Sequence, residues 1–195
     1  FPIFDVSGRV IAFSGRIFED DPEHPQAKYI NSPEGILFDK SRALYGIHEA
    51  KTGIRNLGFS MLVEGQVDLL LAHQLGYKNA VATSGTALTA SHAELLKRYS
   101  PNLLLSYDGD TAGVRATHRA AELLLPLSMN VKVVALPAGA DPADTILTNP
   151  TGFKDAVKHA EPVIDFFMSH IRGTAKDART RNLEVGSVVL PLVAR

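Results

Sequence analysis

The sequence contains no cysteine among its 195 residues, which excludes disulfides and cysteine-ligated zinc from this chain and fits a reducing compartment. No hydrophobic run reaches the roughly 18 residues that a membrane-spanning helix needs, and no signal peptide is recognisable, so we expect no membrane contact. The formal net charge of −1 lacks the basic excess that is typical of proteins binding nucleic acid mainly through charge. The remaining composition, 45% hydrophobic and 21% charged, predicts a globular protein with a normal core.

The order of predicted elements divides the chain into three parts. Because the first residue is Phe1 rather than Met and "FPIFD" already has the pattern of a strand, we expect a piece of a longer protein. Residues 1–57 combine the strand-like "GRVIAFSGRIF" with proline-rich loops and a helical pattern in "KSRALYGIHEAKTGI". Strands and helices then alternate over residues 58–149, which predicts an α/β fold with a parallel sheet sandwiched by helices. Residues 150–195 have a mostly helical pattern.

Acidic residues follow three of the four predicted strands in the middle part. They are Glu64 with Asp68 one helical turn later, Asp108 with Asp110, and Asp141 with Asp144. Ligands of open parallel sheets gather beyond the carboxyl ends of the strands, so these carboxylates are expected to converge on one edge. Neighbouring carboxylates raise one another's pKa, and a hard divalent cation such as Mg²⁺ removes that repulsion. The pattern therefore predicts a Mg²⁺ site for phosphate chemistry.

Taken singly, several of these acids have ordinary structural explanations. Asp110 stands where a helix N-cap is expected, and Asp144 has the same position before "TILTN". Asp68 alone is typical of a solvated helix residue. A capping box is also expected at the start of the helix in "SHAELLKRYS", from Ser91 to Glu94. The joint placement of the acids at three strand ends is what indicates a shared function.

The stretch that begins at Asp108 shares aspartates with two other known motifs. A calcium-binding EF-hand loop would need acidic or amide residues where Ala112 and Arg119 stand, so that motif fails. A phosphotransferase of the haloacid dehalogenase type also opens with Asp-x-Asp after an apolar strand. It would need Thr or Val at Ala112 and gives no role to Glu64. That enzyme class, with Asp108 as nucleophile, remains the alternative.

Several longer stretches resemble a known family. "LVEGQVD", "AVATSGTALTASHAELLKR", "LLLSYDGDTAGVRATHRA" and "LPAGADPADTI" resemble, in order and spacing, the Toprim core of bacterial DnaG-type primases. The upstream "FPIFDVSGRVIAFSGRIF" and "KYINSPEGILFDKSRALYGIHEA" resemble the segment that precedes this core in the same family. The resemblance covers about residues 1–170. Other Toprim proteins, such as topoisomerases, nucleases and recombination scaffolds, share the glutamate and the Asp-x-Asp but lack the upstream run.

The resemblance implies a DNA-dependent RNA polymerase that makes short RNA primers on single-stranded DNA from NTPs. It implies that the acids bind two or more Mg²⁺ or Mn²⁺ ions. The implied catalytic residues are Glu64, Asp108 and Asp110, joined as metal ligands by Asp68, Asp141 and Asp144. The family's zinc module and its helicase-contacting C-terminal region are not in this chain. A bacterial cytoplasmic location at the replication fork follows from the same resemblance.

The resemblance also implies a groove for template and nucleotide. Its implied residues are Arg16, Lys28, Asn31 and Lys40, with Gly65 and Gly109 leaving the backbone open beside the acids. The chain departs from the family at Gln66 and Val67, where an aromatic residue and Met are frequent, and at Thr111, where a basic residue is common. The last two aspartates are also separated by two residues instead of one.

Overall fold

Two sheets organise the chain in this computed structural model, which describes residues 1–17 and 29–194. The strands are β1 (Pro2–Phe4), β2 (Val10–Arg16), β3 (Tyr29–Asn31), β4 (Ser60–Val63), β5 (Ala80–Ala82), β6 (Asn102–Leu105), β7 (Asn130–Val133) and β8 (Glu161–Pro162). The helices are α1 (Ile47–Leu57), α2 (Gln66–Gln74), α3 (Ala90–Lys97), α4 (Thr111–Leu124), α5 (Pro142–Thr148), α6 (Pro150–Lys158), α7 (Val163–Thr174), α8 (Ala178–Glu184) and α9 (Leu190–Val193), with a π-helical segment η1 (Val185–Val189) between the last two.

The larger sheet confirms the predicted α/β fold. Its strand order is β5–β4–β6–β7–β8, and the pairs formed among β4, β5, β6 and β7 are parallel. The connecting helices α2, α3 and α4 follow β4, β5 and β6 in turn, as expected for βαβ crossovers. The edge strand β8 was not predicted. It is only two residues long and pairs antiparallel with β7, so it leaves no alternating pattern in the sequence.

Hydrophobic side chains alternate across the central strands and build a core on each face of this sheet. In β6, Leu103 and Leu105 belong to one core cluster, and Leu104 belongs to the other. The first cluster is completed by α1, α3, α4 and α7, and the second by α2, α5 and α6. Burial on both faces explains why these strands are continuously apolar in the sequence.

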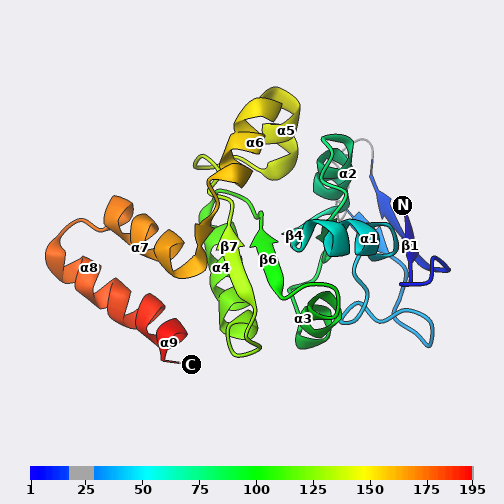
Figure 1. Cartoon of the computed structure of the whole chain (residues 1–195), viewed down its shortest axis with the longest axis horizontal. Helices are drawn as coiled ribbons and strands as arrows, with labels where there is room; N and C mark the ends of the chain where they lie inside the picture. Colours follow the sequence, from blue (N-terminus) through cyan, green and yellow to red (C-terminus); the bar gives the residue numbers. More distant parts are fainter. Residues whose placement is uncertain (18–28, 195) are drawn as a thin grey trace, which may run out of the picture.

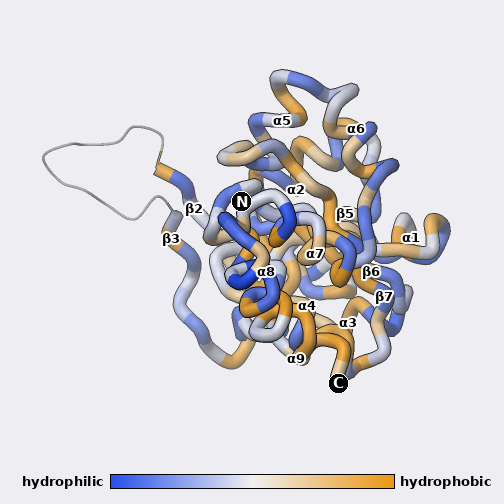
Figure 2. The backbone as a smooth tube through the Cα atoms, turned by 90° about the vertical axis from the view of Figure 1, so that its left-hand side faces the viewer, coloured by the Kyte–Doolittle hydropathy of each residue, from blue (hydrophilic) through white to orange (hydrophobic). Residues whose placement is uncertain are grey.

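The smaller sheet pairs β1, β2 and β3 antiparallel in that order. Figure 2 shows β2 and β3 at one side of the molecule. The C-terminal helices α7, α8 and α9 lie at the opposite end of the molecule from β1 (Figure 1). The exact residues at which the three predicted parts divide remain a prediction.

The predicted capping box at the start of α3 is wrong. The N-cap is Thr89, whose Oγ1 accepts a hydrogen bond from the His92 backbone N–H at 3.2 Å, while the Thr89 N–H donates to His92 Nδ1 at 3.3 Å. The helix therefore begins before Ser91, and both Ser91 and Glu94 lie inside it. Two overlapping cap patterns stand in "TASHAE", and the sequence alone did not separate them.

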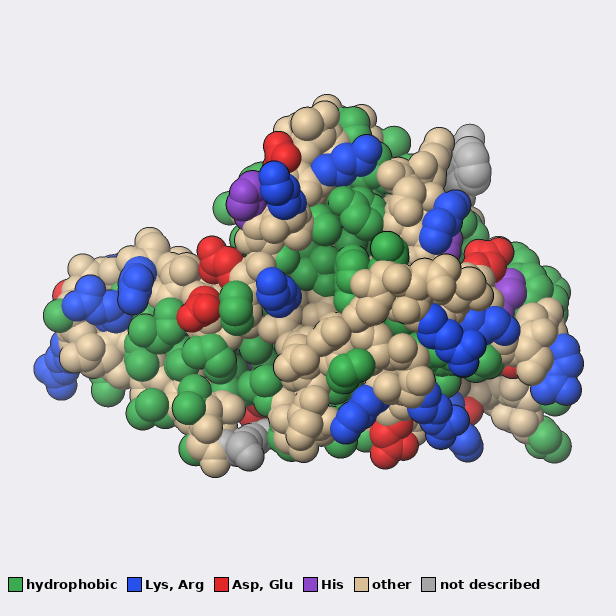
Figure 3. Space-filling view, viewed as in Figure 1, with side chains coloured by type: hydrophobic (Ala, Val, Ile, Leu, Met, Phe, Trp, Pro, Cys, Tyr) green, Lys and Arg blue, Asp and Glu red, His purple; other side chains and the backbone are tan. Residues whose placement is uncertain are grey.

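No helix in the described ranges is long and apolar enough to cross a membrane. On the face shown in Figure 3, Lys and Arg side chains are scattered among other groups and form no continuous basic surface. This distribution agrees with the near-neutral net charge of −1.

Candidate active site

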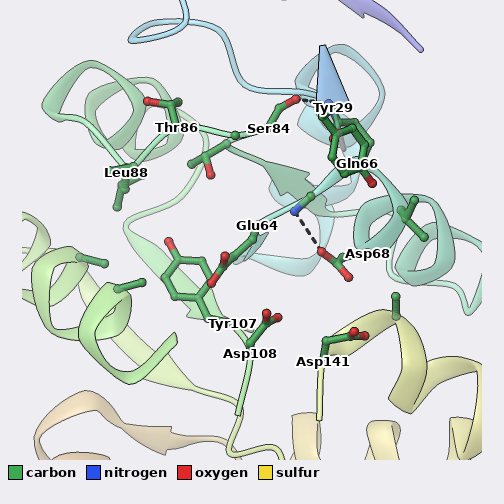
Figure 4. A pocket seen from close by; sticks show the side chains of 18 of the residues that line it. Tyr29, Glu64, Gln66, Asp68, Ser84, Thr86, Leu88, Tyr107, Asp108 and Asp141 are labelled. Atoms are coloured by element: carbon green, nitrogen blue, oxygen red, sulfur yellow. Dashed lines mark hydrogen bonds between the residues drawn. The ribbon is translucent and has the colours of Figure 1, made fainter. Parts of the chain in front are cut away.

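Two neighbouring strands of the parallel sheet end in acidic residues at the same edge. β4 and β6 pair side by side, so Glu64 and Asp108 leave the sheet close together. Asp68 lies in the first turn of α2, and Asp141 stands at the N-cap of α5. Figure 4 shows these four side chains around one open space. They line a cavity of about 760 Å³, so the predicted convergence of the strand-end acids is present in the fold.

Glu64 follows the last residue of β4 and stands among the other acids of the cavity. Its pKa is raised to about 7, first by burial and then by the negative charges of Asp108, Asp68 and Asp110. A hydrogen bond from the Asp108 backbone N–H opposes this shift. A glutamate surrounded by other carboxylates is disfavoured in its charged form unless a cation lies nearby.

Asp68 is fixed by backbone donors from two elements. Burial raises its pKa to about 6, against the hydrogen bond from the Gly65 N–H, whose nitrogen lies 3.0 Å from Asp68 Oδ2. The charges of Asp108 and Asp141 raise the pKa further, and the Ala143 N–H at the start of α5 lowers it. The side chain is therefore a partly buried member of the cavity lining rather than a solvated helix residue.

Asp108 and Asp110 occupy different environments although they are one residue apart. Asp108 is half-buried and lines the cavity, and its pKa is raised by burial and by the charges of Asp141 and Asp110. Asp110 is exposed and caps α4, with its Oδ1 accepting a 2.8 Å hydrogen bond from the Gly113 N–H. It is not among the cavity-lining residues in the described ranges. Its role as a metal ligand stays a prediction.

Asp141 and Asp144 also differ in their arrangement. Asp141 Oδ1 accepts a 2.6 Å hydrogen bond from the Asp144 backbone N–H and so caps α5. Asp144 is exposed on the first turn of that helix, and both residues line the cavity. The extra residue between the two aspartates thus forms part of the helix start. Metal binding by either residue remains a prediction.

The cavity lining also contains a cationic side chain, Arg16. Arg16, at the end of β2, lines the cavity with its guanidinium carbon 5.7 Å from the centre of the Tyr29 ring. Asn31, at the end of β3, reaches the backbone next to the cavity, and its Nδ2 donates to the Ser84 carbonyl at 3.4 Å. Both residues come from the small sheet, so the cavity lies between the small sheet and the large one.

The structure describes one of the two predicted lysines, Lys40. Lys40 is not among the cavity-lining residues in the described ranges. Its backbone N–H donates to Glu34 Oε1 at 3.2 Å, and its carbonyl accepts a 3.0 Å hydrogen bond from the His92 ring. Lys28 lies outside the described residues. Their predicted contacts with nucleic acid remain predictions.

Gly109 has a packing role in addition to its predicted contact with phosphate. A Cβ at Gly109 would lie 2.2 Å from the Pro137 carbonyl oxygen, because the 136–140 loop packs directly on it. Two backbone hydrogen bonds hold this contact, from Gly109 to Ala140 at 2.7 Å and from Gly139 to Gly109 at 3.1 Å. Gly65 is less confined, with Asp68 Oδ2 at 3.1 Å from its Cβ position. Phosphate contact by either glycine remains a prediction.

Two family models match the chain. The model described as Toprim-like matches residues 61–146, which contain the acids of the cavity. The model described as the N-terminal domain of the DNA primase catalytic core matches residues 1–51, which contain Arg16. Both walls of the cavity therefore come from segments with known counterparts.

Relatives and solved structures that are similar to this chain are also DNA primases. The DNA primase of Helicobacter pylori strain J99 is 42% identical over 175 residues, which are 89% of this chain and 31% of that relative. The solved RNA polymerase domain of the Mycobacterium tuberculosis primase DnaG matches with a TM-score of 0.85 at 30% identity, over 100% of this chain and 63% of that chain. A solved DnaG primase catalytic domain bound to ssDNA matches with a TM-score of 0.80 at 34% identity, over 100% and 63%. The chain belongs to the DnaG-type primase family.

This finding confirms the resemblance to the DnaG-type primases that the sequence motifs indicated. The chain spans about a third of the length of the curated primase, 31% of the Helicobacter relative. No observation favours the haloacid dehalogenase alternative.

Two residues of the primase cavity were missed in the sequence. Tyr107 precedes Asp108 and packs beside Glu64 (Figure 4), and its pKa is raised by burial, so the phenol stays protonated. It follows Leu103 and Leu105 at the strand period of two, which is a usable pattern. Arg119 lines the cavity from α4 together with Ala116 and Ala120. Positions 116, 119 and 120 share one helix face, so helical spacing would have found it.

The donor chemistry of the cavity fits a hard divalent cation. Glu64, Asp68 and Asp108 offer carboxylate oxygens, and their pKa values are raised first by burial and then by the charges of neighbouring carboxylates, both of which a bound cation would offset. Within the described residues, no three acidic or histidine side chains enclose a position where protein groups alone could hold an ion. Mg²⁺ commonly binds through one or two carboxylates and completes its shell with water and substrate phosphates, which suits this arrangement.

Without a divalent cation, the protein should lose thermal stability as the pH rises from about 4 to 7. The folded-state pKa values of Glu64 and Asp68, about 7 and 6, exceed their usual 4.5 and 3.8. The folded state therefore binds more protons in this window, and raising the pH favours unfolding. After allowance for solvent screening we expect about 2 kcal/mol, or roughly 5 °C, between pH 5 and 8 in EDTA.

Differential scanning calorimetry at several pH values measures this dependence of the unfolding temperature on pH. Glu64→Gln should remove much of the pH dependence of the unfolding temperature. Glu94→Gln, at an exposed position on α3, should leave that dependence unchanged. Millimolar Mg²⁺ should restore stability at pH 8 in the wild-type protein. A wild-type unfolding temperature that is flat or rises over this range would show that the pKa values of Glu64 and Asp68 are not raised in the folded protein.

Proposed function

We propose that the protein containing this chain is a DNA primase that synthesises short RNA primers on single-stranded DNA for replication. One observation carries the proposal. Glu64 and Asp108 leave adjacent strand ends and line the same cavity as Arg16, in a chain of the DnaG-type family. The DnaG relative solved with ssDNA supports single-stranded DNA as the template. Because the chain spans 31% of the Helicobacter primase, the activity is that of the longer protein.

The proposed reaction is nucleotidyl transfer. A primer 3′-hydroxyl attacks the α-phosphorus of an incoming NTP, the bond to the β-phosphate oxygen breaks, and pyrophosphate leaves. Glu64, Asp108 and Asp110 are the proposed catalytic acids. Arg16 binds triphosphate oxygens with its guanidinium, since a delocalised cation suits phosphate well. Tyr107 excludes water from one side of Glu64 and offers a protonated hydroxyl to the cavity.

The proposed metal is Mg²⁺ or Mn²⁺, with two or more ions in the working enzyme. The residues that would hold it are Glu64, Asp68, Asp108, Asp110, Asp141 and Asp144. A bound divalent cation lowers the pKa of the attacking hydroxyl and neutralises charge on the triphosphate. The protein's own part is to hold several carboxylates against their repulsion on one rigid sheet edge.

The three parts of the chain have separate proposed roles. Residues 1–57 are the end of a primase-specific α+β subdomain, 58–149 the Toprim catalytic core, and 150–195 the start of a helical subdomain. NTPs are the proposed substrates. A zinc module and a helicase-contacting region are proposed to lie in the longer protein. The proposed location is the bacterial cytoplasm, at the replication fork.

Primer synthesis by the full-length protein tests the proposal. Single-stranded DNA, labelled NTPs and Mg²⁺ should give short RNA products that disappear when EDTA is added. A protein that makes no RNA with Mg²⁺ or Mn²⁺ would overturn it. Hydrolysis of small phosphate esters with an aspartyl-phosphate trapped at Asp108 would support the haloacid dehalogenase alternative instead, and DNA binding without incorporation would support a Toprim scaffold.

A further inference from the structure

Gln66 is a buried polar residue next to the acids that the primase reaction does not use. It opens α2, two residues after Glu64, and its side chain is 2% exposed. Its Nε2 donates to Ser14 Oγ at 2.9 Å and also to Ser84 Oγ. These partners are 52 and 18 residues away in the chain. A single amide thus joins β2, the start of α2 and the loop after β5.

The Ser14 end of this link leads to the cationic wall of the cavity. Ser14 is buried in β2 and pairs with Asn31 of β3. Two residues further along, Arg16 pairs with Tyr29, and both line the cavity. The position of Ser14 therefore determines where the guanidinium of Arg16 stands.

The Ser84 end leads to the acidic wall. Ser84 has a φ of 59°, a left-handed conformation that is uncommon for a residue other than glycine. Its N–H donates to the Glu64 carbonyl at 3.0 Å, and its carbonyl accepts from Asn31 Nδ2 at 3.4 Å. Ser84 is therefore bonded to the acidic strand end, to β3 and to Gln66, which holds its unusual conformation in place.

The other contacts between the small sheet and the larger one include apolar packing. Ile3 of β1 and Ala12 of β2 belong to the core cluster that also contains Met61 of β4, and such packing does not fix the direction of a polar group. A buried amide with two hydroxyl acceptors specifies both distance and direction, because its donors are costly to leave unpaired. An apolar side chain would fill the same space without that directional constraint.

We propose that Gln66 is a positioning residue that sets the distance between the Arg16–Tyr29 wall and the carboxylates of Glu64 and Asp68. It acts on how an NTP is bound across the cavity and does not touch the reacting atoms. The inference rests on the proposed primase function for its kinetic consequence. Its structural consequence, a fixed β2–β3 pair, is independent of that function.

Gln66→Leu removes the hydrogen bonds to Ser14 and Ser84 and keeps a side chain of similar volume. This variant tests whether Gln66 affects NTP binding. In primer synthesis by the full-length protein, KM for NTP should rise about tenfold, and kcat should change less than about twofold. In a protein that already carries Arg16→Ala, Gln66→Leu should raise KM for NTP by less than about twofold, because the side chain that Gln66 positions is already absent. The matched control is Gln74→Leu, at the exposed other end of α2. This variant should have the same KM and kcat as the wild-type protein.

Unchanged KM, a fall in kcat alone, or full additivity with Arg16→Ala would overturn the inference. If Gln66→Leu does not fold, Ser14→Ala breaks the same link from the other side and has the same expected results. Amide hydrogen exchange of the wild-type protein and the variant gives a readout that needs no activity. Residues 14–16 and 29–31 should exchange at least about tenfold faster in the variant, with β6 unchanged. Equal exchange rates in the wild-type protein and the variant would overturn the inference about Gln66, whether or not the wild-type protein makes primers. A wild-type protein that makes no primers would overturn only the primase proposal.

Discussion

Asp108→Asn should reduce primer synthesis by the full-length protein about 10³-fold while leaving its unfolding temperature at or above the wild-type value. Asparagine keeps the size and shape of the side chain but removes the charge that a cation needs. Since Asp108 has a raised pKa because of burial, Asp141 and Asp110, losing its charge relieves repulsion in the metal-free protein. The loss of activity would then come from the chemistry of the site and not from the fold. Rates on single-stranded DNA and calorimetry on the same preparations measure both quantities.

Two further variants make this result specific. Asp177→Asn changes a capping aspartate at the start of α8, whose Oδ1 accepts from Thr180 at 2.8 Å, and should leave activity unchanged. Asp110→Asn also keeps a cap, because asparagine caps helices as well as aspartate does. The proposal expects Asp110→Asn to lose activity at unchanged stability. Asp108→Asn with more than a tenth of wild-type activity would contradict the catalytic assignment.

Gly113→Ala should lower the free energy of unfolding by about 3 kcal/mol, or roughly 10 °C, and reduce primer synthesis about 100-fold. A Cβ at Gly113 would lie 2.0 Å from the Asp108 carbonyl oxygen, so the first turn of α4 rests on the backbone of the acid itself. Adding the methyl group must push this turn and Asp108 apart. The change should therefore displace a site carboxylate as well as destabilise the fold.

The matched control is Gly173→Ala in α7, where a Cβ would meet nothing within 4 Å. There, alanine should leave stability unchanged or raise it by up to about 1 kcal/mol, because it favours helix. Thermal unfolding and primer synthesis of the two variants are compared side by side. If Gly113→Ala is as stable and as active as Gly173→Ala, α4 is not packed on Asp108 in the way described.

The sequence predicted the sheet and the meeting of its acids because both depend on local patterns. Apolar strands, helical spacing and glycine stops are visible in the order of residues, and parallel strands bring their carboxyl ends to one edge. That was sufficient for Glu64 and Asp108. The sequence also placed Asp110 where a helix N-cap is expected, and Asp110 does accept a hydrogen bond from the Gly113 N–H at the start of α4.

Contacts between distant segments left no pattern in the sequence. Gln66 was noted only as a departure from the family's frequent aromatic residue, and its partners Ser14 and Ser84 could not be found without the fold. The reason for Gly109 was likewise incomplete, since the 136–140 loop that packs on it comes later in the chain. Lys40 was expected in the groove from the resemblance, but its backbone is bonded to Glu34 and His92 away from the cavity lining.

The most direct test of the central claim is a crystal structure of this chain soaked in millimolar Mn²⁺, with anomalous diffraction used to locate the ion. We expect an anomalous peak at the sheet edge, between Glu64, Asp108 and Asp110. The same peak should be absent from crystals of Asp108→Asn under identical conditions. An empty acidic cluster in the wild type, or Mn²⁺ bound only elsewhere, would contradict the assignment of these carboxylates as the metal site of a primase.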